Sequence, residues 1–219
     1  MTVLQYSAEV APLDETTRDR LSALDTTLLS DAMGGRGTLA AAIGPVAPGM
    51  KLVGPARTAY CPGSVEPGIL AIAACNPGDA LMLDGGGGVA HATLGGVMAL
   101  DAQTRGAAGC VIDGAIRDTA ELRQAGFPIF GRASIPHGAG AEPDGFIDGP
   151  ISIGGVWVNP GDIVVGDDDG VVVIPRADMA TVITAAETKG ALEATWVAAI
   201  KSGRSVKDVH GFADPTPAS

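Results

Sequence analysis

The chain has 219 residues, of which 46% are hydrophobic, so it can bury one sizeable core without disulfide or metal staples. A formal net charge of -11, without runs of lysine or arginine, disfavours a phosphate-binding surface, and we expect no nucleic acid and no membrane as partners. The three cysteines lack C-x-x-C spacing, so we expect reduced thiols. The sequence shows no apolar signal segment and no apolar run long enough to cross a bilayer, so we expect a soluble, cytoplasmic protein.

The chain alternates between segments of helical periodicity and compact apolar runs, which is typical of an α/β domain. Residues 14–33 place several leucines on one helical stripe ahead of Gly34 and Gly35, and we predict a single helix there. Residues 51–61 are predicted to form a strand with a Gly-Pro irregularity, and residues 66–75 a short buried helix.

Two segments of the chain are similar: NPGDALMLDGG from Asn76 and NPGDIVVGDDDG from Asn159. Each combines a Pro-Gly turn, a short apolar strand and an acidic end with glycine. Because Pro fixes φ and Gly supplies a positive φ, both segments are predicted to enter a strand through the same kind of turn. Common turn chemistry and internal duplication both account for the likeness.

The glycine run DGGGG at residues 84–88 does not predict a nucleotide cofactor. A dinucleotide fingerprint opens a helix directly, whereas Val89 to Thr93 follow this run, and no G-K-[ST] sequence completes a phosphate loop. Glycines here are better explained by a backbone that passes close to a ligand or to another segment. The next helix is predicted to begin near Gly95 and Gly96.

Beyond that helix, the pattern predicts a buried strand GCVID, a helix DTAELRQA and a strand FPIF. The second half of the chain is poorer in helix and predicts a meander of strands, followed by a long helix from Pro175 to about Lys201. No linker divides the chain, so we expect one domain over residues 1–210 and a flexible tail over residues 211–219.

The histidines do not predict a zinc centre, because His91, His137 and His210 are far apart in the sequence and lack helical i, i+4 spacing. Magnesium or manganese remains compatible with the sequence. These hard cations need only one or two protein carboxylates and keep water in their other positions.

Arg117 and Asp118 stand side by side between a predicted strand and a predicted helix. Asp118 and Glu121 have the spacing of a capping box, which would explain the aspartate structurally. A cation beside a helix N-terminus opposes the macrodipole, so the cap does not explain Arg117. An arginine at the carboxyl end of a parallel strand suits a bidentate grip on a substrate carboxylate. A structural cap and a binding site both remain open.

A second feature favours a site at this position. The amides of Gly95, Gly96, Val97 and Met98 open a predicted helix, and such amides bind anions. Together with Arg117 they would form a carboxylate pocket. In that arrangement the neighbouring Asp118 would hold a cation.

Glu193 is a third candidate, because the last long helix places this carboxylate within the apolar stripe formed by Leu192, Trp196, Val197 and Ile200. One interpretation puts Glu193 at the exposed end of the stripe. In the other, Glu193 faces a site, on the same or on a neighbouring subunit.

Four ordered blocks, GDALMLDGGG, LGGVMALDAQTRGAAGCVIDGAIRD, ASIPHGAG and PGDIVVGDDDGVVVIP, resemble the RraA-like family over about residues 25–205. This family contains the regulator of ribonuclease E activity and the class II pyruvate aldolases, among them 4-hydroxy-4-methyl-2-oxoglutarate aldolase. The resemblance implies a single-domain, layered α/β sandwich with a mixed central sheet and a long C-terminal helix. It also implies a homo-oligomer, a trimer or hexamer, with its sites between subunits.

By resemblance, Arg117 matches the arginine that binds the pyruvyl carboxylate and enolate, and Asp118 the aspartate that ligates magnesium or manganese. Met98 and its preceding amides match the helix start that receives the substrate. Glu193 matches an acidic residue contributed by an adjacent subunit. The implied activity is a metal-dependent lyase that cleaves 4-hydroxy-2-oxo acids to pyruvate and decarboxylates oxaloacetate.

Two features bear on that implied activity. Regulator-type members, which are non-catalytic binding proteins and form the alternative function, lack the aspartate after the arginine, whereas this chain has Asp118. Its presence favours an enzyme. The aldolases often have Gly-Asp at the helix start, where the aspartate holds metal-bound water, and this chain departs from them with Gly95 and Gly96.

Overall fold

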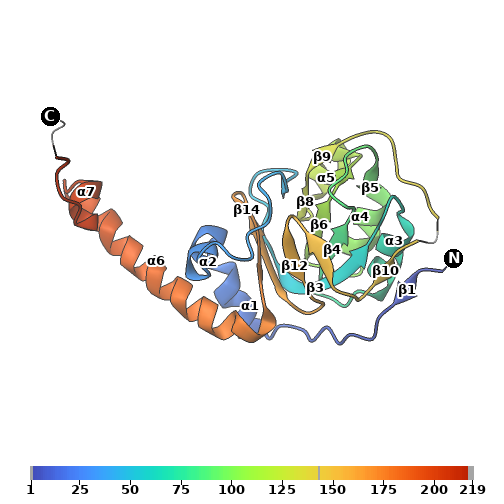
Figure 1. The fold of residues 1–219 in the computed structure, drawn as a ribbon, viewed down its shortest axis with the longest axis horizontal. Helices are drawn as coiled ribbons and strands as arrows, with labels where there is room; N and C mark the ends of the chain where they lie inside the picture. The colour runs from blue at the N-terminus through green and yellow to red at the C-terminus, as the bar shows by residue number, and fades with distance from the viewer. Residues whose placement is uncertain (1, 143, 217–219) are drawn as a thin grey trace.

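A mixed nine-stranded sheet forms the centre of the protein, in the part of the chain that the computed structural model describes, residues 2–142 and 144–216 (Figure 1). Its main path runs in the order β1-β10-β3-β4-β6-β8-β2, and β13 and β14 continue from β3. In that path order, followed by β13 and β14, the strands are Leu4–Gln5, Phe146–Ile147, Leu52–Tyr60, Ala80–Asp84, Gly109–Asp113, Ile129–Gly131, Gly44–Pro45, Ile163–Asp167 and Gly170–Ile174.

The inner strands β3, β4, β6 and β8 are parallel. Strands β10 and β13 pair antiparallel with β3, β2 pairs antiparallel with β8, and β1 pairs parallel with β10. Every residue of β4 and β6 is buried, as expected of parallel strands that are covered on both faces. Alternate residues face opposite sides. Leu81, Leu83 and Cys110 pack toward one layer, while Met82 and Val111 pack toward the other.

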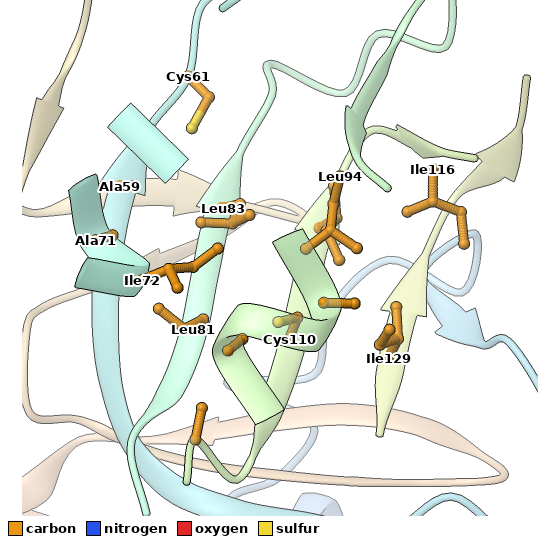
Figure 2. Packing of buried hydrophobic residues seen from close by; sticks show 14 of the residues in the cluster. Ala59, Cys61, Ala71, Ile72, Leu81, Leu83, Leu94, Cys110, Ile116 and Ile129 are labelled. Carbon is orange, nitrogen blue, oxygen red and sulfur yellow. The ribbon is translucent and has the colours of Figure 1, made fainter. Parts of the chain in front are cut away.

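Helices α3 (Glu66–Ala74), α4 (Gly96–Thr104) and α5 (Thr119–Ala125) cover the first face of this sheet. Figure 2 shows Ile72 of α3 next to Leu81 and Leu83 of β4. The opposite face packs on the hairpin of β11 (Ile151–Ile153) and β12 (Val156–Val158) and on one side of β13–β14. The layered α/β architecture with a mixed sheet is therefore confirmed.

The far side of the β13–β14 hairpin is covered by α1 (Glu15–Ser22), α2 (Thr26–Ala32) and the first half of α6 (Met179–Lys201). The prediction of one helix over residues 14–33 was wrong. Thr26 donates its backbone N–H (2.8 Å) and its hydroxyl (2.6 Å) to the Asp167 carboxylate, so α2 starts anew at this residue. A distant carboxylate thus breaks a helix that the leucine spacing alone would continue.

The two similar turns were predicted correctly. Asp79 Oδ2 accepts the N–H of Asn76 at 2.9 Å, and Asp162 Oδ2 accepts that of Asn159 at 2.8 Å. The glycine of each turn has a positive φ, +89° at Gly78 and +86° in the second turn. Each turn leads directly into a central strand.

The long C-terminal helix is confirmed, although a 3-10 turn, Arg176–Asp178, precedes it. Its buried residues, Val182, Ile183 and Ala186, all lie in its first half. Beyond them α6 reaches away from the sheet and ends near α7 (Val206–His210), as Figure 1 shows. Residues 211–216 form neither helix nor strand, and residues 217–219 of the predicted tail lie outside the described residues.

Across the described ranges, no helix combines the length and the apolar character that a membrane crossing requires. A separate three-stranded parallel sheet, β5 (Ala92–Leu94), β7 (Ala115–Ile116) and β9 (Ala133–Ser134), lies next to the carboxyl ends of the central strands. This small sheet carries the candidate site.

Candidate active site

The small parallel sheet brings the two predicted halves of the site together. Its strands β5 and β7 are parallel neighbours, with Leu94 opposite Ile116, so both chains leave the sheet at the same edge. Gly95 follows β5 and Arg117 follows β7. The N–H of Arg117 donates to the carbonyl of Leu94 at 3.0 Å, which fixes the arginine beside the start of α4.

The Asp118 side chain does not cap α5, so of the two interpretations left open the structure excludes the capping box. The residue occupies the N-cap position with φ 61° and ψ 32°, the left-handed region, and its side chain forms no capping hydrogen bond. The carboxylate turns to α4 instead, where Oδ2 accepts the N–H of Gly96 at 2.9 Å. The Nε atom of Arg117 lies 3.7 Å from the same oxygen. A strained backbone conformation of this kind is commonly found at functional sites.

Two glycines allow the Arg117 side chain to lie against the backbone. A Cβ atom on Gly95 would stand 2.9 Å from Arg117 Nε and 2.8 Å from Asp118 Oδ2. A Cβ atom on Gly138 would stand 2.6 Å from Arg117 Nη1. All three distances are too short for a Cβ atom, so a side chain at either position would displace the guanidinium. Glycine at both positions therefore allows the guanidinium to approach the backbone closely.

Arg117 and Asp118 line two adjoining hollows. One is a cavity of about 190 Å³, whose lining also includes Gly95, Val97 and Met98. The other is an open depression of about 610 Å³ that continues over the start of α5 to Glu121. The structure thus brings together the predicted site residues from the start of α4 and from Arg117 and Asp118. Gly96 does not line the cavity, but its N–H donates to Asp118.

The start of α4 presents backbone donors to this cavity. Its first intrahelical bond runs from the N–H of Ala99 to the carbonyl of Gly95 at 3.0 Å. The amides of Val97 and Met98 precede that bond and have no partner in an α-helical pattern. With the helix dipole behind them, these amides are suited to an anion beside Arg117.

Glu193 lies away from this site in the structure of one chain. It is on the half of α6 that projects from the body, away from α4 and α5 in Figure 1, and its Oε1 is 3.8 Å from Lys189 Nζ. The neighbouring Leu192 and Val197 are each 48% exposed. The apolar stripe is thus uncovered in one chain, and a single chain does not bring Glu193 to Arg117.

Sequence reasoning missed several residues of the site. Val65 at the N-cap of α3 and Ile69 within this helix, together with Gly138 and Ala139, complete the lining of the smaller cavity. Glu121 was considered only as part of a possible capping box, but its carboxylate lies against Gly96. For Gly138 the only available signal was its place in the block ASIPHGAG, and nothing in the local pattern indicates contact with Arg117.

The donor atoms at Asp118 fit a hard divalent cation. Within residues 2–142 and 144–216, no group of three or more His, Cys, Asp or Glu side chains forms a ready metal cage. Asp118 Oδ2 accepts the Gly96 amide, while Oδ1 forms no protein hydrogen bond within these same ranges. The carboxylate is 43% exposed, so water can complete a coordination shell around a cation held by this oxygen.

The cysteines offer no thiolate chemistry near neutral pH. Burial raises the pKa of Cys61 to about 12 and also raises the pKa of Cys110 and Cys75 above the ordinary value. Cys61 and Cys110 are fully buried in the core. We therefore assign them a packing role.

Comparison with known proteins bears on this arrangement. The RraA-like family model, described as Aldolase/RraA, matches residues 26–173, which is more than half of the chain. A protein of Halalkalibacterium halodurans, provisionally named a 4-hydroxy-4-methyl-2-oxoglutarate aldolase, is 38% identical over 169 residues, covering 77% of this chain and 80% of that protein. The 4-hydroxy-4-methyl-2-oxoglutarate aldolase of Thermus thermophilus is 40% identical over 99 residues, which cover 45% of this chain and 60% of that protein.

Solved structures agree with these sequence matches. An uncharacterized protein from Pseudomonas syringae has a TM-score of 0.82 at 27% identity, with 94% of this chain and 97% of that one covered. The RNA-processing inhibitor RraA from Thermus thermophilis has a TM-score of 0.64 at 32% identity, with 69% of this chain and 92% of that one covered. On this combined evidence of sequence, fold and site, the chain belongs to the RraA-like family.

Proposed function

We propose that the protein is a divalent-metal-dependent carbon–carbon lyase acting on 2-oxo acids. Its reactions would be retro-aldol cleavage of 4-hydroxy-2-oxo acids to pyruvate and decarboxylation of oxaloacetate, both through a pyruvate enolate. One observation carries the proposal: a guanidinium, a carboxylate with a free oxygen and the first amides of a helix converge on one cavity of about 190 Å³. Relatives named as aldolases support the same reaction class.

Arg117 and the amides of Val97 and Met98 would bind the substrate carboxylate. The guanidinium lies against Gly95 and Gly138, where the lack of side chains leaves it room beside the cavity. Its remaining N–H groups can bind a carboxylate and also stand close to the 2-oxo oxygen. As the carbon–carbon bond breaks, the electron pair moves toward that oxygen, and Arg117 stabilises the developing negative charge.

Asp118 would hold magnesium or manganese through Oδ1, with its other oxygen fixed by Gly96. When bound, the cation supplies Lewis-acid polarisation of the 2-oxo group. No nucleotide cofactor is part of this proposal.

Glu193 would enter the site from a neighbouring subunit of a homo-oligomer, a trimer or hexamer, and accept the proton of the 4-hydroxyl group. Leu192, Val197 and Ile200 are exposed on α6 near Glu193. Exposed apolar residues of this kind mark interaction surfaces, which supports an assembly. In the cleavage, the hydroxyl loses its proton, the C3–C4 bond breaks, and protonation of the enolate at C3 releases pyruvate.

The direct test is a coupled assay for pyruvate release from oxaloacetate and from 4-hydroxy-2-oxo acids, with Mg²⁺ or Mn²⁺ and then with chelator. Activity should disappear with chelator and fall about 100-fold or more in Asp118→Asn and in Arg117→Lys. Asp101→Asn is the matched control, since Asp101 of α4 pairs with Arg105 at 3.0 Å and is not among the residues that line the two hollows. Full activity in chelator, or in Asp118→Asn with unchanged Tm, would reject the metal role.

The second candidate is a non-catalytic regulatory binding protein. The structural similarity to an RNA-processing inhibitor favours it, and the net charge of -11 would suit a basic segment on a partner. Capture of a partner by the purified protein, together with no metal-dependent turnover of any 2-oxo acid, would support this candidate over the lyase.

A further inference from the structure

The smaller cavity beside Arg117 contains one cationic side chain and a wall of hydrocarbon. Among the described residues, the charged groups in its lining are Arg117 and Asp118. Val65, Ile69 and Ala139 contribute only apolar side chains to it. A substrate carboxylate that pairs with Arg117 therefore leaves no protein cation in this cavity for a second carboxylate.

The open depression next to this cavity does not supply a second cation. Within the described ranges, its charged lining residues are Arg117, Asp118 and Glu121, which are one cation and two carboxylates. A second carboxylate on the substrate would meet like charge there, and such repulsion is strong at short range. The depression is therefore unsuited to the far end of a dicarboxylate.

The other cations of this region are engaged elsewhere. All 14 lysines and arginines of the chain lie in the described residues. Arg105 at the end of α4 pairs with Asp101 at 3.0 Å, and Arg132 pairs with Asp113. Neither arginine lines the cavity or the depression.

The half of α6 that would come from a neighbouring subunit brings negative or paired charge. Lys189 forms an ion pair with Asp31 of its own chain, and its Nζ is 3.8 Å from Glu193 Oε1. Glu193 would add a further carboxylate to the site. This contribution also disfavours a second carboxylate on the substrate.

We propose that the protein prefers 4-hydroxy-2-oxo acids that carry one carboxylate and a short apolar group on C4. Arg117 would bind the single carboxylate, while Val65 and Ile69 would contact the apolar group. This inference rests on the proposed function and names its substrate class. It departs from the dicarboxylate in the names of the aldolase relatives. Oxaloacetate remains compatible, because its second carboxylate leaves as uncharged CO₂.

The experiment compares the dissociation constants of 2-oxopentanoate and 2-oxoglutarate for the full chain in excess Mg²⁺, measured by isothermal titration calorimetry. The two acids have the same carbon chain and differ only in a terminal methyl group against a terminal carboxylate. Neither has the 4-hydroxyl group that cleavage requires. A methyl group gains from apolar burial, whereas an unpaired carboxylate loses hydration there. We therefore expect 2-oxopentanoate to bind about 10-fold or more tightly than 2-oxoglutarate.

Pyruvate release gives a second readout of the same preference. 4-Hydroxy-2-oxopentanoate and 4-hydroxy-2-oxoglutarate differ only in a methyl group against a carboxylate on C4. The value of kcat/KM should be about 10-fold or more higher for the first of these two substrates. A higher value for the dicarboxylate would overturn the inference while supporting the lyase.

A charge-switch variant tests the apolar wall itself. Ile69 is exposed on α3 and lines the cavity, so Ile69→Arg would bring a second cation to it. This variant should bind 2-oxoglutarate about 10-fold more tightly than the original chain does. Leu70→Arg is the matched control, since Leu70 is the next exposed residue of the same helix and lines neither hollow. The ratio of the two dissociation constants should stay unchanged in that control.

His137 offers a further check on the assignment. It lies in the chain between two lining residues, Pro136 and Gly138, but it is not part of the lining itself. His137→Gln should therefore leave the ratio of the dissociation constants unchanged. A selective loss of 2-oxoglutarate binding in this variant would reveal a partner for a second carboxylate and overturn the inference.

The outcomes separate the inference from the function on which it rests. If both acids bind and 2-oxoglutarate binds as tightly as 2-oxopentanoate, the substrate preference is wrong and the lyase proposal stands. If neither acid binds in the presence of Mg²⁺, both are overturned. An Ile69→Arg protein with unchanged Tm that binds both acids as the original chain does would place the C4 group away from this wall, and would also overturn the inference.

Discussion

Replacing Gly138 by alanine should inactivate the site without unfolding the protein. The added Cβ would stand 2.6 Å from Arg117 Nη1, and its three nearest heavy atoms all belong to that guanidinium. To reach an ordinary contact of 3.4 Å, the guanidinium must retreat by about 0.8 Å. The Arg117 side chain is 49% exposed, so it can move into solvent at little cost.

The size of the effect follows from that displacement. A misplacement of about 1 Å in a positioning group costs on the order of 100-fold in rate, or about 2.7 kcal/mol of transition-state stabilisation. The stability should change by only about 0.5 kcal/mol, because no core atom is touched. We therefore expect kcat/KM for pyruvate release to fall about 100-fold with Tm almost unchanged.

The assay compares kcat/KM and Tm of Gly138→Ala with those of the unaltered chain and of Gly44→Ala. Gly44 has an ordinary φ and no heavy atom within 4 Å of its added Cβ, so this control should leave both quantities unchanged. A Gly138→Ala protein that turns over at the original rate would refute the role of the guanidinium at this position. A large loss of Tm would show that the glycine serves the fold instead.

Two further predictions concern stability and reactivity. Burial opposes ionisation of Asp167, but hydrogen bonds from Thr26 prevail and lower the pKa of this carboxyl below the ordinary 3.8. The contribution of ionised Asp167 to the free energy of unfolding is therefore present above pH 3.8 and is lost as the pH falls further. Urea unfolding as a function of pH should show this loss. Asp167→Asn should be about 2 kcal/mol less stable at pH 7, and its stability should depend less on pH below 3.8. An unchanged pH dependence in this variant would contradict the prediction. At pH 8, a thiol reagent should label Cys61 and Cys110 only after unfolding, and rapid labelling of either in the native protein would contradict their burial.

Much of the fold could be predicted from local pattern. Fully apolar runs such as residues 80–83 and 110–112 indicated strands buried on both faces, and the structure places them at the centre of the sheet. The two Pro-Gly turns were predictable because their φ values and their Asp side-chain bonds lie within four residues. The break between α1 and α2 was not, since it depends on Asp167, 141 residues from Thr26.

The site was predictable to the same extent. Arg117 was unexpected beside one predicted helix start, and the amides of residues 95–98 lay at a second helix start. Each was therefore a candidate part of a binding site by itself. Their meeting follows from the pairing of β5 with β7, which no local pattern specifies. The spacing of Asp118 and Glu121 fits a helix cap, one of the two interpretations left open, and only the structure shows that both side chains turn to α4.

The sequence by itself determined the class of the fold, the order of its elements and the types of side chain available for chemistry, because these depend on hydrophobic periodicity and turn geometry over a few residues. Only the tertiary structure decided which partner each carboxylate takes. A carboxylate can bond to amides of its own helix or to those of a distant one, and the left-handed φ of Asp118, held by the strands around it, selects the distant amide of Gly96.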